Sequence, residues 1–139
     1  MPQHRPIGLT LLTAFFAFGA LMAGITAVAL LTPGGMLEPI WRLNPQARDA
    51  LRSMSPWGIP LMVVVSTACA ATALALWCGA SWGRRLALVV LGVNLLGDVG
   101  NAVVRHDLRT LSGLPVGAAL IAYLLRPSIR SRFQRTTKA

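Results

Sequence analysis

Charged residues are scarce in this chain, and acidic residues are rarer than basic ones. Only 12% of the 139 residues are charged, and just four of them are Asp or Glu. By contrast, 55% of the residues are hydrophobic and the mean hydropathy is +0.62. This composition is typical of a membrane protein and unlike that of a soluble domain of the same length.

The cysteine content is also low. Both cysteines, Cys69 and Cys78, lie in one apolar run. Nine residues apart on a helix, they point to opposite sides, so a disulfide within the helix is excluded by geometry. No spacing resembles a zinc, haem-attachment or dithiol motif. The cysteines are therefore interpreted as small buried hydrophobic residues.

The side chains that catalysis and metal binding need are rare as well. His4 precedes the first apolar run and His106 follows the third, so the topology puts them on opposite sides of the membrane and they cannot share a metal or haem site. No Ser or Thr has a base at a recognisable spacing, and no Gly-rich phosphate loop is present. Arg105, Asp107 and Arg109 beside His106 could bind an external anion, although a charged interfacial turn is the simpler explanation. The sequence predicts no enzyme activity, no metal and no other cofactor.

Four apolar runs predict an all-α integral membrane protein with four transmembrane helices. Runs of about 20 residues suffice to cross ~30 Å of hydrocarbon. The expected helices are 7–31, 57–79, 85–104 and 108–125, in a single domain that covers 1–139. The first run is too long for the core of a typical signal peptide and is interpreted as a retained helix. The fourth is shorter and contains Pro115, but it can span if Asp107 caps its start, because proline is tolerated in the early turns.

Aromatic and basic residues indicate the topology. Tryptophans flank both ends of the second run, as expected at bilayer interfaces: Trp41, Trp57, Trp77 and Trp82. With both termini on one side, that side holds eight basic residues and the other side holds five, which favours cytoplasmic termini. The eight are Arg5, Arg84, Arg85 and the five basic residues of the tail. The tail 126–139 carries Arg126, Arg130, Arg132, Arg135 and Lys138. Anionic lipid headgroups are their expected partner, and nucleic acid is not.

The connection 33–56 contains a predicted short helix, 45–54. Asn44 is a suitable N-cap and Pro45 suits the first helical position. Apolar residues then recur at i, i+3, i+4 and i+7: Ala47, Ala50, Leu51 and Met54. This amphipathic pattern predicts a helix on the external membrane interface, with a partner-binding element as the alternative.

Small residues recur in the apolar runs and are expected at helix–helix contacts, because helices in lipid associate through close packing. They include Ala20 and Gly24 in the first run and the pair Gly113 and Gly117 in the fourth. A GxxxG spacing is common by chance in apolar segments, so packing within one chain is favoured over dimerisation. Short connections favour an antiparallel bundle.

One polar stripe interrupts the third run. Asn94, Asp98, Asn101 and Arg105 are spaced i, i+4, i+7 and i+11, which places them within about 60° of one another on a helix. A carboxylate inside a membrane segment is costly and marks a candidate site. In the structural interpretation these side chains bond to neighbouring helices and orient the bundle, with Arg105 extending toward Asp98. In the alternative, Asp98 and the asparagines form a proton- or cation-coupled transport site.

Two stretches resemble small multi-pass bacterial membrane proteins that have no assigned activity. They are Asn94-Leu95-Leu96-Gly97-Asp98 through Arg105, and Tyr123-Leu124-Leu125-Arg126-Pro127 with Arg130 and Phe133. The resemblance implies a bacterial inner-membrane location and nothing about chemistry.

The preferred function is that of a small, non-enzymatic accessory or scaffold protein, packed against a larger membrane complex or against itself. The alternative is a small transporter that works through Asp98. Familiar small multidrug exporters place a glutamate in their first helix, whereas the first run here has no acidic residue. No aromatic cluster near Asp98 could hold a lipophilic cation, so transport is the second choice.

Overall fold

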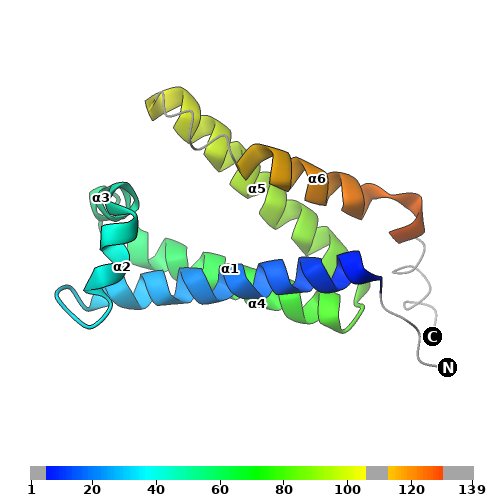
Figure 1. Cartoon of the computed structure of the whole chain (residues 1–139), viewed down its shortest axis with the longest axis horizontal. Coiled ribbons are helices and arrows are strands. Elements are labelled where there is room, and N and C mark those ends of the chain that lie inside the picture. Colours follow the sequence, from blue (N-terminus) through cyan, green and yellow to red (C-terminus); the bar gives the residue numbers. More distant parts are fainter. Residues whose placement is uncertain (1–5, 106–112, 130–139) are drawn as a thin grey trace. The chain divides into compact units, whose positions relative to one another are not determined.

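The protein is described by a computed structural model that covers residues 6–105 and 113–129. All regular secondary structure in these ranges is helical, so the all-α prediction is confirmed for them (Figure 1). In chain order the helices are α1 (Ile7–Leu31), α2 (Glu38–Leu43), α3 (Pro45–Ser53), α4 (Gly58–Trp77), α5 (Ser81–Arg105) and α6 (Gly113–Leu125).

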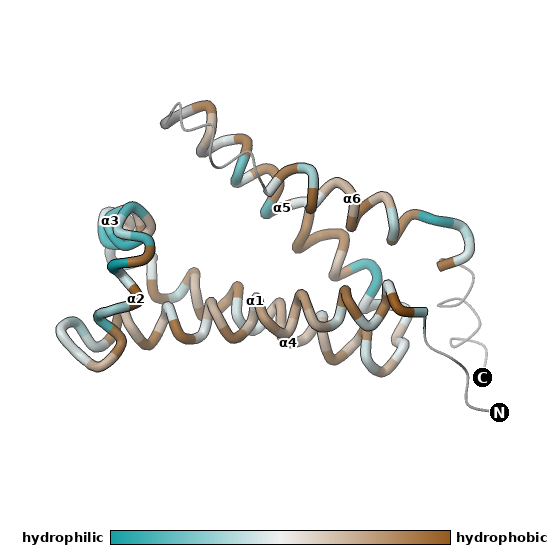
Figure 2. Tube along the Cα trace, viewed as in Figure 1, coloured by the Kyte–Doolittle hydropathy of each residue, from teal (hydrophilic) through white to brown (hydrophobic). Residues whose placement is uncertain are grey.

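Helices α1 and α4 are the two, among the described residues, that are long and apolar enough to cross a membrane. They have 25 and 20 residues, against the ~20 that a bilayer requires. Only 28% of the residues in the apolar stretch of each helix are buried within the protein, so most of these residues are at least partly exposed. The hydropathy colouring shows the contrast between these two helices and the hydrophilic α3 (Figure 2). The apolar helix α6 is shorter, with 13 residues.

The helix boundaries lie close to the predicted ones. The first predicted helix has the observed bounds of α1, and the second is shortened to those of α4. The third begins at Ser81 instead of residue 85, so Arg84 lies in the helix and not in a loop. The described part of the fourth begins at Gly113; the predicted start at 108 and its cap Asp107 lie outside the described residues.

A tight turn explains the early start of α5. Gly79 adopts a φ of +69°, which closes α4 in a Schellman motif. The N–H of Gly79 donates to the carbonyl of Leu76 at 3.2 Å, and the N–H of Ala80 donates to the carbonyl of Ala75 at 2.8 Å. Because these bonds complete the turn by Ala80, the next residue can begin a helix.

The chain divides into two compact units, and the first comprises Phe15–Ala70. In it, the hydroxyl of Ser66 on α4 donates a hydrogen bond to the carbonyl of Ala20 on α1 at 2.8 Å. A Cβ added at Gly24 would lie 3.3 Å from the same hydroxyl, and one at Gly19 would lie 3.7 Å from the sulfur of Cys69. Small residues on α1 thus permit α4 to approach closely.

The same unit contains α2 and α3. The side-chain oxygen of Asn44 accepts a hydrogen bond from the N–H of Ala47 at 3.1 Å, which confirms the predicted N-cap of α3. The short helix α2 was not predicted. It contains Trp41, which is only 6% exposed and lies 6.0 Å from the guanidinium of Arg48 on α3. Arg48 also forms an ion pair with Glu38 at the start of α2.

The tryptophans therefore divide into two kinds. Trp57, Trp77 and Trp82 are each more than half exposed, as side chains at a bilayer interface would be. Trp41 is instead buried beneath Arg48, so its predicted position in the aromatic belt is wrong. It packs within the protein because α2 and α3 fold onto each other.

The second unit comprises Met1–Ala14 and Ala71–Ala139. Its buried side chains include Leu12 from α1, Leu76 from α4, Ala87 from α5 and Leu124 from α6. Helices α5 and α6 contact each other along this unit, and Figure 1 shows them side by side. The α5–α6 pair carries the candidate site.

Candidate functional site

The predicted polar stripe lies along α5. The side chain of Asn94 is exposed, and that of Asp98 is half-buried. Asn101 and Arg105 also belong to α5, but their side chains lie outside the described part of the structure. The proposed approach of Arg105 to Asp98 therefore stays a prediction.

Asp98 lies against the beginning of α6. A Cβ added at Gly113, the first residue of α6, would lie 3.2 Å from a carboxyl oxygen (Oδ2) of Asp98. The first turn of a helix has backbone N–H groups without partners inside the helix, and its end carries a partial positive charge. The carboxyl group of Asp98 therefore lies beside the first described turn of α6.

The next contact lies one turn further along both helices. A Cβ added at Gly117 would collide with the side chain of Leu95. Asp98 thus lies opposite Gly113, and Leu95 lies opposite Gly117. Residue numbers therefore decrease along α5 as they increase along α6. This is the pattern of an antiparallel pair, and both glycines of the GxxxG spacing contact α5 in the same chain.

The opposite end of α6 contacts a charge of the opposite sign. The Nη1 of Arg84, in the first turn of α5, donates a hydrogen bond to the carbonyl of Leu124 at 3.4 Å. Leu124 is the penultimate residue of α6, and the last carbonyls of a helix lack partners inside it and carry partial negative charge. A cation therefore meets the negative end of α6.

The spacing of these two charges matches the length of α6. Arg84 and Asp98 are 14 residues apart in α5, or about 21 Å at 1.5 Å per residue. The 13 residues of α6 are about 20 Å long. Each charge at its helix end contributes about 0.3–1 kcal/mol. The pair of charges also specifies direction, because a parallel α6 would bring like-signed charges together at both ends.

Sequence reasoning identified Asp98, Gly113 and Gly117 but missed Arg84. The charge count places Arg84 among the cytoplasmic loop charges, because the sequence predicts a third helix that begins at residue 85. The sequence offers no local signal for this contact, because the predicted run 108–125 is longer than the 14-residue spacing between Arg84 and Asp98.

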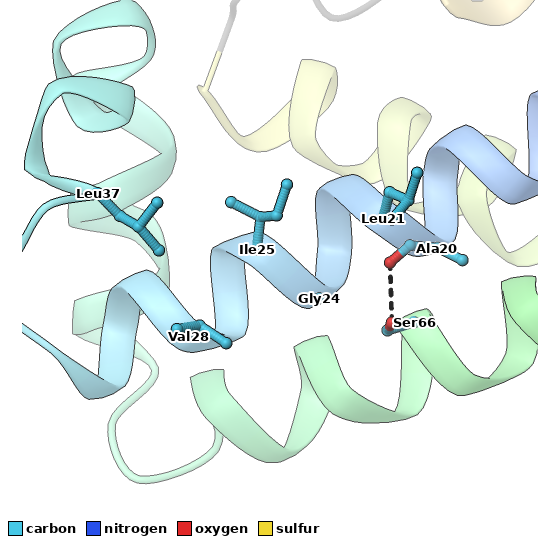
Figure 3. Close-up of a pocket in the computed structure, with 7 residues that line it drawn as sticks. All are labelled: Ala20, Leu21, Gly24, Ile25, Val28, Leu37 and Ser66. Carbon is cyan, nitrogen blue, oxygen red and sulfur yellow. Dashed lines mark hydrogen bonds between the residues drawn. The ribbon is translucent and has the colours of Figure 1, made fainter.

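The other predicted packing residues, Ala20 and Gly24, line an open groove of about 530 Å³ in the unit Phe15–Ala70 (Figure 3). The remaining lining residues are Leu21, Ile25, Val28, Leu37 and Ser66. Ser66 is the polar member of this set, and its hydroxyl is already donated to the carbonyl of Ala20. The groove is thus an apolar surface and offers no free polar side chain to a ligand.

No protein-family model, curated protein or solved structure matches this chain. The fold and the site define only a class of protein: all regular secondary structure in residues 6–105 and 113–129 is helical, two of these helices are able to span a membrane, and Asp98 and Arg84 of α5 lie at the two ends of α6. The resemblance to small bacterial multi-pass proteins stays a prediction.

Proposed function

We propose that this chain is a protein of the bacterial inner membrane with four transmembrane helices and that it serves as a small, non-enzymatic accessory or scaffold subunit. The observation that carries the proposal is the carboxyl oxygen of Asp98 at the first residue of α6. Asp98 is the one acidic residue in the apolar runs. This position gives Asp98 a packing contact within the chain. The presence of an acidic residue in this apolar run therefore does not require a transported ion.

The outward-facing apolar surface supports the membrane location. Helices that are apolar on all sides are stable when lipid or other protein surrounds them. In α1 and α4, only 28% of the residues in the apolar stretch are buried, and the others would contact lipid. In the proposed topology α5 and α6 cross the membrane as a pair, and both termini lie in the cytoplasm.

The polar parts of the chain fit the same arrangement. Helix α3 has Arg52 exposed and Ala50 and Leu51 half-buried, which suits a helix that lies on the external membrane surface. The basic tail 126–139 would bind anionic headgroups on the cytoplasmic side. Neither part is large enough to form a soluble catalytic domain, and the partner we propose is therefore another membrane protein or a second copy.

Transport through Asp98 is the competing function, and one substitution separates the two. Asp98→Asn keeps a hydrogen-bonding side chain of similar shape but removes the group that could carry a proton. If Asp98 serves packing, the variant should insert and accumulate like the wild type, with unfolding free energy lower by about 0.3–1 kcal/mol, the magnitude of a charge at a helix end.

The measurement is made on proteoliposomes that contain equal amounts of the two proteins. Unfolding in mixed micelles gives the stability, and a proton-sensitive dye inside the vesicles reports ion movement. A wild-type protein that moves protons or cations, together with a folded Asp98→Asn variant that does not, would refute the accessory function. A stable complex recovered from native membranes in mild detergent would support it.

A further inference from the structure

Asn94 places an exposed amide at the centre of α5, which crosses the membrane in the proposed topology. It is the fourteenth of the 25 residues of α5, so about 16–20 Å of helix lies on either side of it. Its side chain is exposed, and no hydrogen bond to it occurs among the residues that the structure describes. Asparagine is too short to reach the membrane surface, and an amide without a partner in hydrocarbon is costly.

We propose that Asn94 pairs with Asn94 of a second copy of this chain and that the resulting helix contact forms a homodimer. The proposal rests on the proposed function, in which α5 spans the membrane, and it names the partner. A carboxamide both donates and accepts hydrogen bonds, so two copies related by a twofold axis satisfy each other with the same residue. No other side chain of complementary chemistry has to be supplied.

The face around Asn94 allows the close approach that such a contact requires. Gly97 lies about 60° from Asn94 around the helix, whereas Asp98 and Leu95 lie about 40° and 100° away in the opposite direction. Leu95 and Asp98 face α6. A Cβ added at Gly97 would meet nothing within 4 Å. The side of Asn94 away from α6 therefore combines a central amide with an open glycine, and interhelical amides and close backbones are what associate helices in lipid.

The test is self-association of the full-length chain in vesicles of zwitterionic lipid. Copies labelled with donor and acceptor fluorophores are mixed, and energy transfer is measured as the lipid-to-protein ratio is raised. Asn94→Val should weaken dimerisation about tenfold, which corresponds to about 1.4 kcal/mol, because it removes the interhelical amide bonds. Asn94→Gln keeps the amide and should retain the dimer.

Gly97→Leu and Gly92→Leu form a matched pair. Both glycines have open space around their added Cβ, but Gly92 lies about 160° from Asn94 around the helix. Gly97→Leu should therefore disrupt energy transfer and Gly92→Leu should not. Circular dichroism of each variant establishes that the helical content is unchanged.

A wild-type chain that is monomeric at every lipid ratio would overturn the proposal, and so would energy transfer that is equally sensitive to both leucine substitutions. Recovery of a stoichiometric complex with a different membrane protein, without a homodimer, would also overturn it but leave the accessory function intact. Failure of the chain to remain in membranes after alkaline extraction would instead refute the membrane function on which both depend.

Discussion

A single methyl group at Gly83 tests how closely α4 and α5 approach. A Cβ added there would lie 2.7 Å from the Cβ of Ala75, 2.9 Å from its carbonyl carbon and 3.1 Å from the nitrogen of Leu76. Two of these atoms are backbone, so no rotamer change can relieve the overlap. The turn through Gly79 joins the two helices directly, which leaves the backbones little freedom to separate.

Two effects of Gly83→Ala oppose each other. Overpacking a close contact costs about 1–3 kcal/mol. Replacing glycine by alanine in a helix interior recovers at most about 1 kcal/mol, and less at the third residue of α5. The steric term should win, so we expect the free energy of unfolding to fall by about 1–2 kcal/mol.

The assay is reversible unfolding of the full chain in mixed micelles, followed by circular dichroism as the fraction of denaturing detergent rises. Gly92→Ala is the control, because it lies in the same helix and its added Cβ would meet nothing within 4 Å. It should be neutral or stabilising by up to about 1 kcal/mol. If Gly83→Ala proved as stable as Gly92→Ala, the tight α4–α5 contact would be refuted.

Two further predictions concern the unit Phe15–Ala70. Ser66→Ala removes the hydrogen bond to the carbonyl of Ala20 and should lower the free energy of unfolding by about 0.6 kcal/mol in the same assay; an unchanged value would show that the bond adds no stability. The N–H of Gly34, and then the nearby Arg48, hold the pKa of Glu38 below its ordinary value of 4.5. The stability that Glu38 contributes is therefore full above pH 4.5 and lost as the pH falls through its lowered folded pKa. A carbon NMR titration should find the Glu38 pKa below 4.5 even in Arg48→Gln, because the Gly34 bond is the larger cause, and a value of 4.5 or above in that variant would contradict the assignment.

The helices were largely predictable because the signals that define them are local. The length and apolar content of α1 are properties of one continuous run, and the N-cap of α3 depends on Asn44, Pro45 and Ala47 alone. Such signals need no knowledge of distant parts of the chain. The location of small residues at helix contacts was also foreseeable, because close packing in lipid requires them.

The parts that were missed depend on contacts between residues that the sequence does not connect. Helix α2 has six residues, too few to be stable alone. It is accompanied by the pairing of Glu38 with Arg48 and by the burial of Trp41. No local sequence pattern predicts a helix of this length. The same contacts bury Trp41, which the sequence predicts at the membrane interface.

The helical character of this chain, its long apolar segments and the one acidic residue among them can be read from composition and periodicity, which are properties of the chain alone. What that acidic residue contacts depends on how the helices pack. A helix end attracts a charge only where the fold brings the two together, and α6 lies along α5 so that its beginning meets Asp98 and its end meets Arg84. The sequence shows that Asp98 is an acidic residue in an apolar run. Its contact with the beginning of α6 depends on the register of the two packed helices.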